Sequence, residues 1–404
     1  SQAITIPLQK SNLQPGAEAF LTLRFSLPED TPWSNAGHEV AAAQFPLPVP
    51  EANSQSVVER TPVDLAELPA LSLQETAETA TISGDGLQLV YDKANGRITS
   101  WKKNGVELIA SGPALNLWRA PTDNDGIKLD DERYHLLDEW LRAGLHDLQY
   151  EVEEVTVKQP TPQVIVIRSR ARGGSEAKPD ALEHEQTLTI FGSGDLLLSN
   201  EVATHQGLPP LPRIGLTMEL PAGFEKISWF GRGPFENYRD RNSGALVNLY
   251  HSTVSGQYVP YIVPQDHGNK TDVRWVALTN DDGAGLLAIG MPATGRSLME
   301  ISAGHYTAGD LYAAAHTHEL TPHAETILNL DLMQMGLGTA SCGPATLPDY
   351  LIVPGAYSFS ISLRPFTKED PPPAILARTP LPLSLIHISE PTRLKTRSRM
   401  PSSA

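Results

Sequence analysis

The sequence predicts an all-β protein built mainly as one large antiparallel sandwich. The first observation is composition: 34 prolines and 31 glycines against 6 methionines indicate many turns joining short strands. The second is that segments of alternating polar and apolar residues recur between residues 80 and 366, whereas only one stretch has helical periodicity. Many strands with a single helix favour a large antiparallel sandwich over an α/β barrel.

Length, charge and cysteine count exclude several classes of protein. The 404 residues allow two to three average domains, and the 31 basic against 47 acidic residues give a net charge of −16. This charge disfavours binding to nucleic acids and to anionic membranes. A single cysteine excludes an internal disulfide, no apolar run reaches the about 18 residues of a membrane span, and Ser1–Lys10 lacks a signal-peptide pattern.

The first 48 residues predict two strands. Ala17–Leu27 alternates, with Leu21, Leu23 and Phe25 on one face, and Glu39–Phe45 precedes a run of prolines. Two strands cannot close a sandwich, so we expect residues 1–48 to be the end of a domain that starts earlier. The polar, acidic residues 49–79 predict a linker or an extended strap.

Beyond residue 79 the pattern predicts a series of strands. Residues 86–101 predict a hairpin that turns at Asn95-Gly96. Asp130–Ala143 predicts a helix whose apolar face carries Leu136, Leu137, Trp140 and Leu141. Further strands are expected at 148–158, 163–170, 185–192, 196–203, 213–219, 246–250, 273–279, 285–290, 325–333 and 356–364.

Four segments are more specific than a sandwich requires. They are Leu117-Trp-Arg-Ala-Pro-Thr-Asp-Asn-Asp-Gly126, the segment 229–241 with Gly-Pro-Phe-Glu-Asn-Tyr238, the segment 258–275 with Gln-Asp-His-Gly268, and Asp331-Leu-Met-Gln-Met-Gly-Leu-Gly338. In this order and spacing they resemble the C-terminal domain of the large β-galactosidases of glycoside hydrolase family 2, which some organisms encode as a separate small subunit. Residues 1–48 resemble the end of the preceding immunoglobulin-like domain.

The resemblance implies a domain organisation and an activity. It implies a galactose mutarotase-like super-sandwich over 80–368, after a partial immunoglobulin-like β-sandwich at 1–48 and a linker at 49–79. It also implies a role in hydrolysing terminal, lactose-like β-D-galactosides, with the catalytic carboxylates and their magnesium ligands in a barrel domain that precedes this chain. No catalytic residue or cofactor is therefore expected within the chain, and the isolated chain is expected to be inactive. We further expect that the partner of this chain is the barrel-containing part of the enzyme, and that the complete enzyme is a cytoplasmic homo-oligomer. We favour the interpretation that the chain comes from a truncated gene over a genuine small subunit.

The resemblance also implies where the chain approaches the sugar. The loop after Asp123, Asn124 and Asp125 lies beside the sugar pocket in family members and moves, and Gly126 would provide its hinge. The alternative, which we favour, is that Asp123 and Asp125 only cap the turn and the following helix. After Gly338, family members place a stacking tryptophan, whereas this chain has Thr339-Ala-Ser-Cys-Gly-Pro344. Ser341 and Cys342 are the substrate-binding candidates there, although Cys342 is expected to be an inert packing residue.

Other polar residues favour structural roles. Glu236, Arg239 and Arg241 predict an ion network between strands, because partly buried charges need partners. His316 and His318 would share one strand face, but the spacing supplies no third metal ligand for them or for His305, which favours hydrogen bonding. Asp266-His-Gly268 is expected in a loop, at a domain interface. The remaining aromatic candidates are expected in the core or at interfaces: Trp229, Tyr238, Tyr258, Tyr261 and Trp275.

The end of the chain differs from the rest. The sandwich is expected to close near Phe366, followed by a proline-rich tail at 369–382. Residues 383–404, beginning Leu-Ser-Leu-Ile-His-Ile-Ser-Glu390, resemble a translated sequencing adapter and are left out of the fold prediction. Two other functions stay open: a non-catalytic carbohydrate-binding or assembly module, and an epimerase of the mutarotase type, which rests on fold analogy alone.

Overall fold

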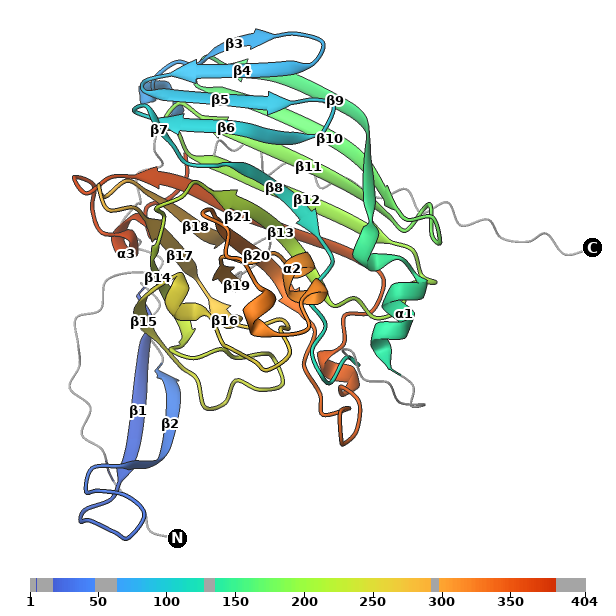
Figure 1. Cartoon of the computed structure of the whole chain (residues 1–404). Helices are drawn as coiled ribbons and strands as arrows, with labels where there is room; N and C mark the ends of the chain where they lie inside the picture. The colour runs from blue at the N-terminus through green and yellow to red at the C-terminus, as the bar shows by residue number, and fades with distance from the viewer. Residues whose placement is uncertain (1–4, 6–16, 48–63, 127–134, 292–297, 383–404) are drawn as a thin grey trace, which may run out of the picture.

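A computed structural model describes residue 5 and residues 17–47, 64–126, 135–291 and 298–382. Its strands form four sheets, in which every pairing is antiparallel (Figure 1). This arrangement confirms the predicted all-β, antiparallel class. Among the residues so described, no helix is both long and apolar enough to cross a membrane.

The largest sheet has nine strands and the other two sheets of the sandwich have five each. The order of the first is β15 (Leu246–Thr253), β14 (Lys226–Gly233), β17 (Trp275–Thr279), β18 (Gly285–Met291), β21 (Ala356–Phe366), β12 (Leu196–Thr204), β11 (Leu182–Phe191), β10 (Val164–Gly174) and β9 (Gln149–Thr161). The second contains β16 (Lys270–Val273), β19 (Met299–Gly304), β20 (Thr326–Gln334), β13 (Arg213–Leu220) and β8 (Ser111–Asn116). The third contains β3 (Ser72–Glu75), β4 (Thr79–Gly84), β5 (Leu87–Asp92), β6 (Arg97–Lys103) and β7 (Val106–Glu107).

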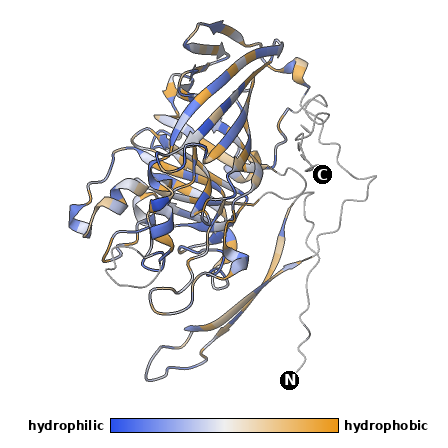
Figure 2. Ribbon diagram, turned by 90° about the vertical axis from the view of Figure 1, so that its right-hand side faces the viewer, coloured by the Kyte–Doolittle hydropathy of each residue, from blue (hydrophilic) through white to orange (hydrophobic). Residues whose placement is uncertain are grey.

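The three sheets share one large hydrophobic core, and a second, smaller cluster lies around Trp275. The large core contains buried side chains from each of the sheets, such as Trp101 of β6, Leu188 of β11 and Leu328 of β20. In many of the strands alternating polar and apolar residues place one side in this core, which Figure 2 shows as alternating blue and orange. The expected core aromatics Trp229, Tyr238 and Trp275 are indeed buried.

Two strands from the N-terminal segment form a separate hairpin. β1 (Ala19–Ser26) and β2 (Glu39–Leu47) pair as the alternation predicts, and they project from the sandwich beside β15 (Figure 1). The Gln44 amide exchanges two hydrogen bonds with the backbone of Val247, at 2.9 and 2.8 Å. Glu18 forms an ion pair with Arg274 at 2.7 Å. These contacts fix the hairpin to the edge of the nine-stranded sheet.

The segments expected to be a linker and a tail both contribute structure. Ser72–Glu75, the end of the expected 49–79 linker, is strand β3, because Leu73 packs against the core and the backbone pairs with β4. The short 3-10 helix η1 (Leu65–Glu67) precedes it. In the proline-rich tail, α3 (Pro373–Leu376) docks on the nine-stranded sheet, and Arg364 donates to Leu376 O at 2.6 Å. Residues 48–63 and the adapter-like residues 383–404 lie outside the described part.

Short helical elements connect the strands near one end of the sandwich. α1 (Leu136–Arg142) lies within the predicted helix and buries Leu137 and Trp140, while residues 130–134 of that prediction lie outside the described residues. The 3-10 helices η2 (Leu145–Asp147) and η3 (Ser255–Gln257) follow α1 and β15. α2 (Ala308–Ala313) and η4 (Thr317–Glu319) lie between β19 and β20, and η5 (Pro348–Tyr350) precedes β21.

Candidate functional site

All four sequence motifs meet around one buried arginine. Arg119, in the segment that follows β8, has no solvent-exposed surface. Its guanidinium donates to both carboxylate oxygens of Asp125 at 2.8 and 3.0 Å, to Gln334 Oε1 at 3.2 Å and to Met335 O at 2.7 Å. Burial alone would lower the pKa of Arg119, but Asp125 and Asp266 outweigh burial and raise it. Arg119 is therefore a permanent cation that holds two motifs together.

Asp125 organises the turn that carries the predicted site residues. Besides the Arg119 pair, its carboxylate accepts hydrogen bonds from the backbone N and Oγ1 of Thr122, at 2.9 and 3.0 Å. Its backbone oxygen accepts from Leu137 N at 2.8 Å, which joins the turn to the first turn of α1. Asp125 is 2% exposed. The Asp125 carboxylate thus caps the turn and has no free face for a ligand, whereas α1 receives only the backbone oxygen of Asp125 and has no side-chain cap.

Gly126 is held in a conformation that other residues rarely adopt. Its φ is +103°, and a Cβ added there would lie 2.4 Å from the Cβ of His135. Only glycine avoids both the left-handed strain and the close approach. The loop that would move about this glycine, residues 127–134, lies outside the described residues.

Asn124 joins two of the predicted site segments, although they are far apart in the sequence. Its Nδ2 donates to Gly338 O at 2.9 Å, while its Oδ1 accepts from Ser341 N at 3.1 Å and from Ser341 Oγ at 2.7 Å. The amide is half-buried, so these bonds are only partly exposed to competing water. The turn at 122–126 and the loop at 336–344 therefore form one continuous surface, which we call the 124/341 wall.

Asp240 and the loop's own backbone shape the other half of the wall. The Asp240 carboxylate accepts from Leu337 N at 3.0 Å and from Gly338 N at 2.7 Å. Thr339 N donates to Pro344 O at 3.2 Å, closing the loop on itself. Cys342 is exposed at its tip, so the expectation that it packs in the interior is wrong: the loop closes through backbone bonds and leaves this side chain outside.

Asp123 is the exposed carboxylate of the wall. Its backbone N donates to Gln265 Oε1 at 3.2 Å. In the same segment Asp266 is buried and accepts from Tyr238 Oη at 2.8 Å, while its N donates to Ala120 O at 3.1 Å. These bonds complete the convergence of the four motifs and orient the turn that carries Asp123.

The predicted ion network around Glu236 is present with a different membership. Arg241 pairs with Glu236 at 2.8 Å, and Tyr261 Oη and Gly268 N also donate to this carboxylate. Arg239 does not join the network as expected; its guanidinium lies 3.6 Å from Met333 Sδ. The members come from loops rather than strands, which is why strand spacing predicted them incorrectly.

The histidines split into two groups. His305 lies between Glu325 O at 2.9 Å and Glu225 Oε2 at 3.0 Å, a hydrogen-bonding role as expected. His316 and His318 do not share a strand face, because His316 caps the 3-10 helix η4 and His318 lies within it. The same turn brings Glu319 beside them, a neighbour that strand spacing did not reveal.

Two buried carboxyl groups were missed by the sequence analysis. Glu300 of β19 and Asp331 of β20 are direct cross-strand partners and are 6% and 0% exposed. Burial raises the pKa of Glu300 to about 8 and that of Asp331 to about 7. Asp331 pairs with Arg213 at 2.9 Å. Alternation does not reveal them, because it groups Asp331 with Asn329 on the polar face of β20, and β19 is buried on both sides and shows no alternation.

Comparison with known proteins identifies two matching families. The beta-galactosidase small chain family matches residues 83–363, and beta-galactosidase domain 4 matches residues 1–48. A beta-galactosidase of Priestia megaterium is 34% identical over 350 residues, which is 86% of this chain and 32% of that protein. The Vibrio cholerae beta-galactosidase is 31% identical over 89% of this chain and 34% of that protein. The chain thus spans about a third of the length of these relatives.

Solved structures with similar folds are more distant. A galactose 1-epimerase from Lactobacillus acidophilus is 8% identical with a TM-score of 0.35, covering 74% of this chain and 99% of that one. A GalM/aldose epimerase homologue from C. elegans is 11% identical with a TM-score of 0.36 and the same coverage. Likenesses this distant carry no argument about function.

Proposed function

Since this chain belongs to the beta-galactosidase small chain family, we propose that its 124/341 wall forms one side of the galactoside pocket of a glycoside hydrolase. The observation that carries the proposal is the Asn124 bridge to Gly338 and Ser341, which builds a single surface from the two segments that the family resemblance places at the sugar. The Asp123 carboxylate is exposed on this surface and can accept hydrogen bonds from sugar hydroxyls.

The role of the wall is to position the sugar rather than to cleave it. Glycoside hydrolysis needs two carboxyl groups that reach the glycosidic bond from opposite sides, about 5–5.5 Å apart when configuration is retained. Glu300 and Asp331 face each other but are buried, and Asp331 is committed to Arg213. We therefore assign the catalytic pair and the magnesium ligands to a barrel domain elsewhere in the enzyme. The complete enzyme would assemble as a homo-oligomer.

A chimaera tests the wall directly. The segment of the Priestia megaterium beta-galactosidase that corresponds to this chain is replaced by it, and turnover of a chromogenic galactoside is measured. Asn124→Ala removes both bridges of the wall, and Asp123→Asn removes only the exposed charge. Asp281→Asn is the matched control, because Asp281 is exposed in the turn between β17 and β18, outside the wall, and pairs with Lys226 of β14.

The expected results distinguish the wall residues from an exposed residue outside the wall. Asp123→Asn should lower kcat/KM by about tenfold, the size of one hydrogen bond to the sugar, and Asn124→Ala should lower it because the two segments of the wall are no longer joined. Asp281→Asn should not change it. If all three variants keep the kcat/KM of the unmodified chimaera, the wall does not form part of the sugar pocket.

The alternative of an epimerase needs a histidine and a carboxylate on the walls of one cavity. The cavity of about 330 Å³ beside β19 and β20 is lined by Arg239, Asp272 and Glu300 but by no histidine. The alternative of a non-catalytic carbohydrate-binding module predicts galactose binding by the isolated chain. Calorimetric titration with galactose tests it: measurable binding without the barrel favours the module, and no binding favours the shared pocket.

A further inference from the structure

The connection between β19 and β20 is unusually rich in histidine. Residues 305–323 contain four of the 12 histidines of the chain. Two of them each have a single carboxylate partner: His305 pairs with Glu225 at 3.0 Å and His323 with Asp310 at 2.9 Å. The other two, His316 and His318, lie together on η4 and share one acidic neighbour.

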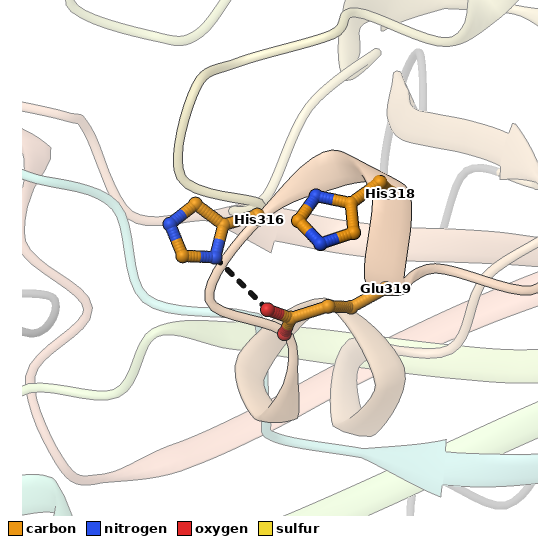
Figure 3. Close-up of side chains that lie close together, drawn as sticks. All are labelled: His316, His318 and Glu319. Carbon is orange, nitrogen blue, oxygen red and sulfur yellow. Dashed lines mark hydrogen bonds and ion pairs between the residues drawn. The ribbon is translucent and has the colours of Figure 1, made fainter.

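His316, His318 and Glu319 form a compact group of metal-binding side chains. One ligand atom from each residue lies within 4.8 Å of the other two. His316 Nδ1 is 2.9 Å from Glu319 Oε1, and the two imidazole rings stack with centroids 5.4 Å apart and planes inclined by 25°. Figure 3 shows the three side chains on one side of the turn, with the carboxylate below the two rings. All three are exposed, so a hydrated ion can reach them.

The local backbone explains why the three side chains converge. His316 is in the extended conformation, with φ −139° and ψ 154°, and Thr317–Glu319 then make one 3-10 turn. Because a 3-10 helix has three residues per turn, residues three apart lie above one another, which places Glu319 beside His316. Ala315 N donates to Glu319 Oε2 at 2.8 Å and fixes the carboxylate. Together with the hydrogen bond from His316 Nδ1 to Glu319 Oε1, this contact holds the carboxylate beside the two imidazole rings.

We propose that His316, His318 and Glu319 bind a divalent transition-metal ion, Zn²⁺ in the first instance, with water at the remaining position. Two imidazole nitrogens and a carboxylate oxygen are a donor set suited to borderline metals such as Zn²⁺, whereas Mg²⁺ prefers oxygen ligands alone. Ligand atoms at about 2.0–2.2 Å from tetrahedral zinc lie roughly 3.3–3.6 Å apart. The observed separations, from 2.9 to at most 4.8 Å, bracket this value.

The site would stabilise a segment that supports the 124/341 wall. Tyr312 of α2 contacts Trp118 edge to face at 5.9 Å, and Trp118 precedes the buried Arg119. A metal ion on η4 would cross-link the turn that follows α2. The site is separate from the magnesium ligands assigned to the barrel, because its ligands all lie in this chain.

Metal titration of the full chain tests the proposal. Co²⁺ replaces Zn²⁺ as an optical probe, since tetrahedral Co²⁺ has strong visible absorption bands, and Zn²⁺ binding is measured by calorimetry. His318→Gln removes one nitrogen ligand. Glu319→Gln removes the charged ligand but keeps an oxygen to accept from Ala315 N. His323→Gln is the matched control, because it removes an exposed histidine–carboxylate pair of the same connection.

The wild-type chain should bind one Co²⁺ or Zn²⁺ and develop the tetrahedral spectrum, and Mg²⁺ should not compete. Loss of a residue that only hydrogen-bonds to a ligand lowers metal affinity by about 10–100-fold. His318→Gln and Glu319→Gln each remove a ligand and should lower the affinity by more than this, while His323→Gln should bind metal as the wild type does. Melting without metal should be the same for all variants, because these side chains are exposed. Absence of a tetrahedral Co²⁺ spectrum, unchanged binding by His318→Gln and Glu319→Gln, or equal loss in His323→Gln would overturn the proposal.

Discussion

The substitution Asp125→Ala should destabilise the sandwich strongly, because it removes the ion-pair partner of a buried arginine. Arg119 is fully buried and directs three hydrogen bonds to the Asp125 carboxylate, at 2.8, 3.0 and 3.2 Å. After the substitution it keeps only the neutral acceptors Gln334 Oε1 and Met335 O. Removing one partner of such a buried pair costs about 3–5 kcal/mol of folding free energy.

The melting midpoint gives the corresponding observable. At about 2.1 cal/mol/K per residue, a sandwich of roughly 300 residues unfolds with an entropy near 0.6 kcal/mol/K, so the midpoint should fall by about 5–8 °C. Differential scanning calorimetry measures this fall. Asp281→Ala is the control, since Asp281 forms an exposed pair with Lys226 and should leave the midpoint unchanged.

A double variant separates the ion pair from general damage to the turn. Replacing a buried pair by apolar residues of similar volume is often neutral, so Arg119→Met with Asp125→Leu should recover the part of the loss that comes from the unpaired charge, while the part from the lost Thr122 hydrogen bonds remains. If Asp125→Ala melts within the error of Asp281→Ala, the pair does not organise the wall and our reasoning about Arg119 is refuted.

Three further predictions concern a glycine, a buried acid and the thiol. Gly126→Ala should lower the melting midpoint more than Gly223→Ala. Both glycines have a positive φ, but a Cβ at Gly126 would lie 2.4 Å from His135 Cβ, whereas a Cβ at Gly223 would have no neighbour within 4 Å. Equal losses would contradict the close contact. Burial raises the pKa of Glu300 from 4.5 to about 8, so the folded chain keeps a proton that the unfolded chain releases. Stability should therefore fall as pH rises from about 4.5 to about 8, and Glu300→Gln should flatten this part of the midpoint-versus-pH curve; parallel curves would refute the assignment. Cys342 is exposed, so one thiol should react with Ellman's reagent in the native chain, and a thiol that reacts only after denaturation would contradict this placement.

The sequence predicted the strands whose pattern is local. β10, β11 and β12 alternate clearly and were expected within a few residues of their observed limits. β14 was missed because Gly231, Arg232 and Gly233 interrupt the apolar pattern of its second half. β19 was missed because it is short and mostly buried on both sides, which removes the alternation.

The wall depends on contacts that no local pattern encodes. Asn124 and Ser341 are 217 residues apart, and only the sheet topology brings them together. The family resemblance named both residues but not the bridge between them. A local signal for the buried pair did exist. Arg119 is the only basic residue of the motif 117–126, and Asp125 lies in the same short motif. The placement of His316 and His318 on one strand face was wrong because a strand repeat of two was assumed where the chain makes a turn with a repeat of three.

We propose that this chain completes a galactoside pocket whose catalytic carboxyl groups lie in another domain. Galactosidase turnover by the isolated chain and by the chimaera with the Priestia megaterium barrel tests it most directly. We predict no turnover of a chromogenic galactoside by the isolated chain and clear turnover by the chimaera, reduced by Asn124→Ala. Turnover by the isolated chain at a rate comparable to that of the chimaera would contradict the account.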